Sequence, residues 1–325
     1  MDRLLSILSL CRGGRRFAMP CLRRTKFSWK RAVRRILIVV LVLTMLSVAG
    51  SSSAFWVIFR RTPPPDLGPA PSFEDVDAAR YPYEQVSFPS GENMLTGHWF
   101  PAPDPVGTVL IVHGFASSGE AHLIEAMYFR DNGFSVLVYD ATGMGESEGD
   151  SVVGLCQSRW DVIAAVGYLR DNHPDTPLFL YGHSMGGYGV LAALAEVEAD
   201  GVVCVNGFRS PVSLMHLTAR RYVGILADFG YPFILLQNHL TFGSDGNADA
   251  LETAGQTQVP VLILNARDDA TVPQKAQLQP GDTEYENIEF CTIDGGHTGI
   301  WLAEDQRTAN TQLLDRIVSF YLSTQ

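Results

Sequence analysis

The segment from Leu178 to Gly187, LFLYGHSMGG, places a serine between two glycines. An apolar run precedes Gly182 and a helix-like stretch follows Ser184, so the segment predicts a strand, a sharp turn and a helix, with the serine at the apex. Such a turn is strained, and the lack of a side chain at Gly182 and Gly186 fits it. A hydroxyl at the apex is clear of the backbone and lies at the positive end of the following helix. The spacing predicts that Ser184 is a nucleophile.

A serine of ordinary pKa is a weak nucleophile and needs a base that a carboxylate orients. Two later segments supply both groups, each in a loop directly after a strand-like run. The predicted acid is Asp269, in VLILNARDDATVP, and the predicted base is His297, at the end of IEFCTIDGGH. Neighbours in a loop point in different directions, so Asp268 is an alternative to Asp269 and not a second partner of the same imidazole.

Other polar residues near these segments are interpreted as structural. His113 is expected to orient a loop beside the serine, His183 to pack or line the rim, Asp140 to form a turn and Asp294 to lie in a surface turn. The cysteines show neither a metal-binding spacing nor a histidine placed for catalysis, and they are expected to be packing residues: Cys11, Cys21, Cys156, Cys204 and Cys291. No metal and no organic cofactor is implied.

Elements that can position these residues alternate along the chain. Several apolar runs are continuous in Val, Ile and Leu, as in parallel strands that are covered on both faces. Alternation with helix-like stretches favours an α/β fold with a mostly parallel eight-stranded sheet flanked by helices. The predicted strands are Glu84–Phe88, Leu95–Phe100, Thr108–His113, Ser135–Asp140, Leu178–Tyr181, Val202–Asn206, Val261–Asn265 and Ile288–Ile293, and the predicted helices are 119–131, 154–171, 185–198 and 305–322.

One interval, residues 209–256, breaks this alternation. It contains no strand-like run, but aromatic and aliphatic residues are too frequent in it for a plain loop. We expect a helical cap insertion, which could be a simple cover over the sheet or a lid over an acyl pocket.

Residues 84–322 resemble the α/β-hydrolase superfamily, especially its monoacylglycerol-lipase-like and lysophospholipase-like branches. The matching motifs are His113-Gly114-Phe115, Asp140 with GMGES, the serine turn, Asp269-x-x-Val-Pro and Gly-Gly-His297. The order Ser184, Asp269, His297 is that of the superfamily. The resemblance implies an oxyanion hole built from the backbone N–H groups of Phe115 and Met185. Ala141 stands where relatives often carry arginine, so the subfamily stays open.

The N-terminal part of the chain differs in character. Residues 1–35 form a basic arm with eleven Lys and Arg against Asp2, a net charge of +10. Since the net charge of the whole chain is −11, the residues after 35 carry a net charge of −21. The uncharged run Ile36–Phe59 would span roughly 36 Å as a helix, enough to cross a hydrocarbon core of about 30 Å. Positive charge before the run predicts a signal-anchor with a cytoplasmic N-terminus. Small residues at Ser47-Val48-Ala49 leave a cleaved signal peptide as the alternative.

Residues 60–79, rich in proline and acid, are expected to be a linker that lifts the domain of residues 80–325 off the membrane. The strongly acidic body repels phosphate backbones, so nucleic acid is not an expected partner. We infer no obligate protein partner.

The resemblance and the predicted triad imply a serine hydrolase that cleaves a small-molecule or lipid ester outside the cytoplasm. An aminopeptidase or amidase of the same fold is the alternative, since such relatives share these motifs. A non-catalytic binding module is a third reading, which the intact triad and both turn glycines disfavour.

Overall fold

The computed structural model describes residues 28–61, 63, 68, 70–281 and 285–325. It divides into two units, Met1–Met45 and Leu46–Gln325, which are described separately here. The long helix α1 (Trp29–Phe59) begins in the first unit, and its last turns belong to the second, together with the α/β domain. Residues 1–27 of the predicted basic arm lie outside the described residues.

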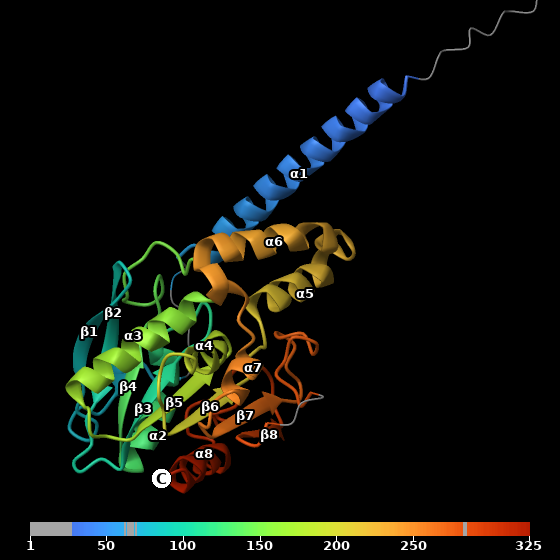
Figure 1. The fold of residues 1–325 in the computed structure, drawn as a ribbon. Coiled ribbons are helices and arrows are strands. Elements are labelled where there is room, and N and C mark those ends of the chain that lie inside the picture. The colour runs from blue at the N-terminus through green and yellow to red at the C-terminus, as the bar shows by residue number, and fades with distance from the viewer. Residues whose placement is uncertain (1–27, 62, 64–67, 69, 282–284) are drawn as a thin grey trace, which may run out of the picture. The chain divides into compact units, whose positions relative to one another are not determined.

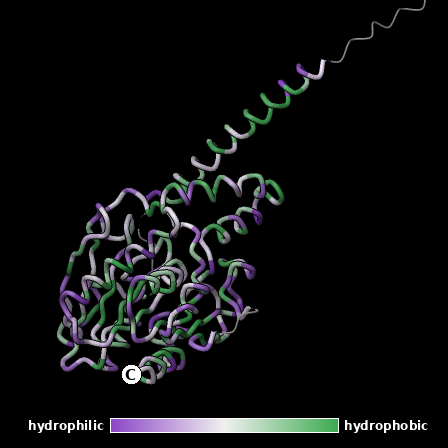
Figure 2. Tube along the Cα trace, viewed as in Figure 1, coloured by the Kyte–Doolittle hydropathy of each residue, from purple (hydrophilic) through white to green (hydrophobic). Residues whose placement is uncertain are grey.

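Helix α1 begins seven residues before the predicted membrane segment and ends with it at Phe59. Within the described ranges it is the one helix long and apolar enough to cross a bilayer, a test that a signal sequence also passes. Figure 2 shows the nearly continuous hydrophobic colouring of its middle part.

Eight strands form one sheet in the order β1-β2-β4-β3-β5-β6-β7-β8 (Figure 1). The pairs β1–β2 and β2–β4 are antiparallel, and every other neighbouring pair is parallel. The predicted fold class is confirmed, and each predicted strand end lies within two residues of the observed one. The strands are β1 (Glu84–Ser90), β2 (Asn93–Phe100), β3 (Gly107–Val112), β4 (Phe134–Tyr139), β5 (Leu178–His183), β6 (Gly201–Val205), β7 (Val261–Ala266) and β8 (Ile288–Ile293).

Two hydrophobic clusters cover the two faces of the sheet. Alternate residues of one strand point to opposite faces, so Leu110 of β3 lies in one cluster and Ile111 in the other. The first cluster includes side chains from α3 (Gln157–Asn172), α4 (Met185–Ala193) and α7 (Ala250–Gly255), and the second includes side chains from α2 (Leu123–Asp131) and α8 (Thr311–Ser323). Short 3-10 helices η1 (Phe73–Asp75) and η2 (Gly119–His122) lie before β1 and α2.

The expected cap insertion is built mainly from α5 (Pro211–Val223) and α6 (Leu226–Phe242), which lie against each other outside the two helical layers (Figure 1). A 3-10 helix, η3 (Gly243–Asn247), follows them. The insertion is shorter than the predicted 209–256, because α7 buries Ala250, Leu251 and Ala254 in the core of the main domain.

The range predicted as a linker contacts the domain at both of its described ends. Arg60 forms a β-bridge with Ser151, and the guanidinium of Arg61 donates to backbone carbonyls of residues 145–149. Near the other end, the N–H of Phe73 donates to Glu120. These contacts differ from the expectation of a free spacer. Residues 62, 64–67 and 69 lie outside the described part.

Candidate active site

The predicted turn around Ser184 is present and strained. Strand β5 ends at His183 and α4 begins at Met185, so Ser184 is the single residue between them. Its φ of 55° and ψ of −111° lie where side-chain-bearing residues rarely occur. A Cβ at Gly182 would lie 2.4 Å from the carbonyl oxygen of Gly186, and one at Gly186 would lie 2.1 Å from a β3 carbonyl oxygen. Backbone contacts this close explain why both flanking positions are glycine.

The structure brings the three predicted catalytic side chains together. The hydroxyl of Ser184 donates to Nε2 of His297 over 2.9 Å, and Nδ1–H of His297 donates to Oδ2 of Asp269 over 2.8 Å. The three residues follow β5, β8 and β7, whose carboxyl ends lie at one edge of the sheet. The Asp269 side chain is 1% exposed and that of His297 is 11% exposed. A buried carboxylate thus orients a partly accessible base beside the hydroxyl.

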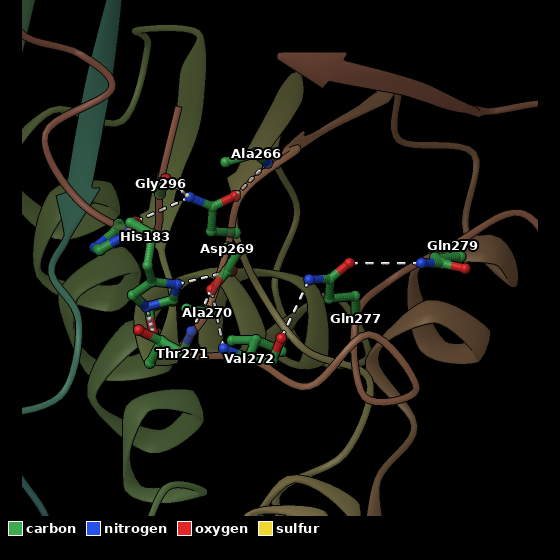
Figure 3. Close-up of polar contacts among 12 residues, drawn as sticks. His183, Ala266, Asp269, Ala270, Thr271, Val272, Gln277, Gln279 and Gly296 are labelled. Carbon is green, nitrogen blue, oxygen red and sulfur yellow. Dashed lines mark hydrogen bonds and ion pairs between the residues drawn. The ribbon is translucent and has the colours of Figure 1, made fainter. Parts of the chain in front are cut away.

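The environment of Asp269 keeps its carboxylate ionised. Burial raises its pKa, but the hydrogen bond from His297, the N–H groups of Val272 and Thr271 and attraction to the imidazole together outweigh burial. The net pKa is below the ordinary carboxyl value. Oδ1 accepts from the N–H of Thr271 over 2.8 Å and of Val272 over 3.0 Å (Figure 3). One oxygen is therefore held by the loop, while the other faces the base.

The alternative acid, Asp268, is exposed, and its backbone N–H donates to the carbonyl of Gly295. The neighbouring Arg267 pairs with Asp294 over 2.9 Å at the surface. Asp294 is thus the surface residue that the sequence predicted. Among the described residues, Asp269 is the carboxylate that reaches His297.

The predicted oxyanion-hole residues border the serine from two sides. Met185 is the first residue of α4, so its N–H lies at a helix N-terminus. Phe115 lies in the loop after β3, and a Cβ at its neighbour Gly114 would lie 3.2 Å from the Cβ of Ser184. Neither N–H has a hydrogen-bond partner among the described residues. Both donors are available to a developing oxyanion.

His113 holds this loop. It is fully buried, its Nδ1–H donates to the carbonyl of Gly114 over 2.7 Å, and its Nε2 accepts from the N–H of Ala141 over 2.9 Å. Burial lowers the pKa of His113, so the imidazole is neutral and both bonds persist at neutral pH. Asp140 accepts from two backbone N–H groups of the turns around it. Both residues have the structural places that the sequence predicted.

Two further residues hold the predicted base, His297, and the sequence gave neither of them this role. Nε2–H of His183 donates to the carbonyl oxygen of His297 over 2.7 Å, and the amide of Asn206 donates to the same oxygen over 2.9 Å. The Asn206 oxygen accepts from the N–H of Ala266, which joins the ends of β6 and β7 (Figure 3). Asn206 has φ of 50°, and asparagine tolerates this left-handed conformation. The signal in the sequence that could have indicated this role is an asparagine directly after a buried strand.

A buried pair lies deeper in the same region. Nδ1–H of His122 donates to Glu125 over 2.6 Å, and both side chains are at most 1% exposed. The ring centroid of His122 is 5.7 Å from that of His183. Burial, together with the neighbouring histidines His122 and His297, holds the pKa of His183 well below its ordinary value. No motif marks this pair in the sequence.

The described cysteines behave as packing residues. Burial raises the pKa of Cys156 to about 11 and that of Cys204 to about 12, while Cys291 is partly exposed. Cys11 and Cys21 lie outside the described residues. Within the described ranges, no group of three or more His, Cys, Asp or Glu side chains is arranged to hold a metal ion.

A family model described as serine aminopeptidase, S33, matches residues 103–234. This range contains Phe115, Ser184 and Met185 but ends before Asp269 and His297.

Relatives of known sequence include both lipases and proteins without an assigned activity. The uncharacterized protein YfhR of Escherichia coli K12 is 28% identical over 246 residues, 73% of this chain and 81% of that protein. An uncharacterized membrane protein of Saccharomyces cerevisiae is 27% identical over 204 residues, 61% of this chain and 66% of that protein. A monoacylglycerol lipase of Mycolicibacterium smegmatis is 35% identical over 112 residues, 34% of this chain and 40% of that protein. Among such relatives, the match spans between 36% and 81% of the relative's length.

Solved structures share the fold. An esterase of Pyrococcus furiosus superposes with a TM-score of 0.59 at 20% identity, covering 82% of this chain and 98% of that one. An α/β hydrolase of a Penicillium species has a TM-score of 0.54 at 19% identity, covering 75% and 99%. At these identities the likeness establishes the fold.

Proposed function

We propose that this chain, which has the α/β-hydrolase fold and resembles the monoacylglycerol lipases, cleaves carboxylic esters with Ser184 as nucleophile. The observation that carries the proposal is the relay from Ser184 through His297 to Asp269, at 2.9 and 2.8 Å, on a strained turn. Such strain is costly and persists where the surrounding structure maintains it.

Acylation follows from the arrangement of the relay. As Oγ of Ser184 attacks the ester carbonyl carbon, Nε2 of His297 takes its proton, and Asp269 stabilises the imidazolium. The carbonyl oxygen becomes an oxyanion facing the N–H groups of Phe115 and Met185, and one such donor contributes about 3–4 kcal/mol in a serine protease. The tetrahedral intermediate then expels the alcohol, which takes the proton from His297.

Deacylation repeats these roles with water. His297 takes a proton from a water molecule as the water oxygen attacks the acyl carbon. A second oxyanion then forms beside the N–H groups of Phe115 and Met185. When that intermediate collapses, Oγ of Ser184 leaves and regains its proton from His297, releasing the carboxylic acid. No cofactor enters these steps.

A lipid-like ester is the proposed substrate class. The relatives named as monoacylglycerol lipases support this class, and so does the cap. Leu214, Met215 and Leu217 of α5 pack against the hydrophobic cluster that contains Met185. Apolar side chains on this side of the cap suit an acyl chain.

An aminopeptidase or amidase activity is the second candidate, favoured by the family model described as serine aminopeptidase. Amides and esters pass through the same tetrahedral intermediate, so the relay serves either. A non-catalytic binding role is disfavoured because such a role has no need of the strained turn.

We place the enzyme on a membrane as a single-pass protein, with its N-terminus in the cytoplasm and its domain outside. The apolar helix α1 supports membrane attachment, as does the relative described as a membrane protein. The eleven basic residues before Ile36 support the orientation.

The decisive experiment labels the purified full-length chain with a fluorophosphonate probe, which reacts only with an activated serine. We expect labelling in the wild type and none in Ser184→Ala, together with a fall in ester turnover of about 10⁶-fold, the loss found when a serine protease loses its nucleophile. The matched control is Ser323→Ala, an exposed serine of α8, which should label like the wild type. Ester hydrolysis near the wild-type rate in Ser184→Ala would refute the proposal.

Substrate class is tested in parallel with p-nitrophenyl esters of rising chain length and with aminoacyl-naphthylamides. Faster cleavage of the amides than of any ester would replace the esterase assignment with the peptidase one.

A further inference from the structure

The last turns of α1 end inside the α/β domain. Phe59 is 2% exposed and belongs to the first hydrophobic cluster, although the residues just before it in the helix are exposed. Its ring lies 4.4 Å from that of Phe55, centroid to centroid, and 5.6 Å from that of Phe115 in an edge-to-face arrangement. The apolar helix therefore contacts Phe115, whose N–H is predicted to belong to the oxyanion hole.

The end of α1 also lies close to the cap, through the ring of Phe55. A Cβ at Gly154, before α3, would lie 3.1 Å from the Phe55 ring and 2.8 Å from the ring of Phe242, the last residue of α6. Phe55 and Phe242 thus converge over one glycine. The end of α1, the end of the cap and the oxyanion loop meet through Phe55, Phe59, Phe115 and Phe242.

Polar contacts fix the end of α1 in this position. The carbonyl of Phe59 accepts from the N–H of Val152, and the Arg61 N–H donates to the carbonyl of Asp150. The Arg61 guanidinium donates to the carbonyls of Gly145, Ser147 and Gly149 at 2.6 to 3.0 Å. Several bonds to one loop hold this end more firmly than a flexible tether would.

The oxyanion loop needs such support. Ala116, next to Phe115, has φ of 54°, a left-handed conformation that is unfavourable for a residue with a side chain. A donor is effective only when its N–H already points to the place where the oxyanion forms. Phe115 is partly buried against the first hydrophobic cluster, so its ring is the part of the residue on which neighbouring side chains can act.

We propose that Phe59 is a positioning residue of the active site: held by α1, its ring fixes Phe115 and thereby aims the Phe115 N–H at the oxyanion. The inference rests on the proposed function and extends it, since it makes the end of the hydrophobic helix part of the catalytic machinery. It also holds if the chain is cleaved after Ala49, because both Phe55 and Phe59 follow that position.

The test uses the full-length chain in detergent and compares Phe59→Ala with Phe88→Ala. Phe88 is also 2% exposed and lies in the same cluster, but its ring packs on Tyr139 and Tyr168. The two variants remove the same volume from the same core, so we expect similar falls in Tm. Only Phe59→Ala should lower kcat for p-nitrophenyl butyrate, by about tenfold, less than the loss when an oxyanion donor is removed outright. Its KM should change little.

A second readout isolates the oxyanion. An alkyl trifluoromethyl ketone accepts Oγ of Ser184 at its carbonyl carbon, the proton passes to His297, and the carbonyl oxygen becomes an oxyanion held by the same donors. Its inhibition constant should rise with Phe59→Ala by the factor lost in kcat/KM, and stay near the wild-type value in Phe88→Ala. Phe59→Leu, which keeps an apolar contact, should restore most of both parameters.

Three results would overturn the inference. The first is a Phe59→Ala enzyme with wild-type kcat, and the second is a lower kcat with an unchanged inhibition constant. If Phe59→Ala does not fold, Arg61→Ala replaces it, since Arg61 is exposed and its loss removes the three guanidinium bonds that help to hold the same helix end. Arg61→Ala should raise the inhibition constant of the trifluoromethyl ketone several-fold. An unchanged inhibition constant in this variant is the third result that would overturn the inference. A wild-type protein without labelling at Ser184 would instead refute the proposed function and this inference with it.

Discussion

At the scale of single residues, the loop after β7 offers His297 two neighbouring carboxylates in different surroundings. Asp269 is buried and accepts two backbone N–H groups besides the imidazole. Asp268 is exposed. Only a carboxylate held in this way selects the tautomer of His297 in which Nε2 is free to accept the proton of Ser184.

We therefore expect Asp269→Asn to lose several orders of magnitude in kcat, since the corresponding change in a serine protease costs about 10⁴-fold by favouring the wrong tautomer. Asp268→Asn is the matched control and should lose less than roughly tenfold, because an exposed charge near a site is largely screened. Steady-state kinetics of the two purified variants measure both. If Asp268→Asn is the inactive enzyme, the acid is assigned to the wrong neighbour.

The sequence indicated the residues that we propose to react and not those that hold them. Ser184, Asp269 and His297 are recognisable because each would react through its own side chain and stands in a local motif. Asn206 and His183 act by donating to the backbone carbonyl of His297, which is distant in the chain. Such a bond depends on which strand ends are neighbours and on one left-handed φ, and neither follows from residue type.

At the scale of elements, the strands were predictable because continuous apolar runs mark strands buried on both faces. Their order was not, since periodicity carries no information on which strands pair. The burial of Phe59 was also hidden: it ends an apolar run that membrane insertion alone explains. Likewise α7 falls within the predicted cap interval, because six residues are too few for their pattern to show whether the helix packs on the sheet or in a cap.

The cap gives a prediction on acyl-chain length. Since a buried methylene contributes about 0.8 kcal/mol, kcat/KM should rise up to about fourfold per added carbon from acetyl to medium-chain p-nitrophenyl esters. Replacing Leu214 and Met215, on the side of α5 that packs on the core, with alanine should flatten this rise. The matched control replaces Leu236 and Leu240, exposed on α6, and should leave the profile unchanged. A wild-type optimum at acetyl with no activity beyond butyryl would contradict the lipid assignment.

At the scale of the whole molecule, charge is divided between a basic arm and an acidic body. In the topology that we propose, a bilayer crossed by Ile36–Phe59 separates the two, with the positive charge retained in the cytoplasm. The bonds from Arg60 and Arg61 to the catalytic domain leave no free spacer at that point of the chain. The orientation of the helix therefore decides which compartment supplies the substrate.

The wild-type cysteines test that orientation without engineering. We expect a membrane-impermeant maleimide applied to spheroplasts to label Cys291, which is partly exposed, and to leave Cys11 and Cys21 of the arm unlabelled until the membrane is opened. Cys156 and Cys204 should stay unlabelled in both samples, because burial blocks access and raises their pKa values to about 11 and about 12, so few thiolates form near neutral pH. Peptide mass mapping identifies each site, Cys291→Ser removes the external signal, and labelling in detergent confirms that Cys291 can react. The opposite pattern, with the arm labelled in sealed spheroplasts and Cys291 protected, would mean that the helix is inserted the other way and that the enzyme meets its substrate inside the cell.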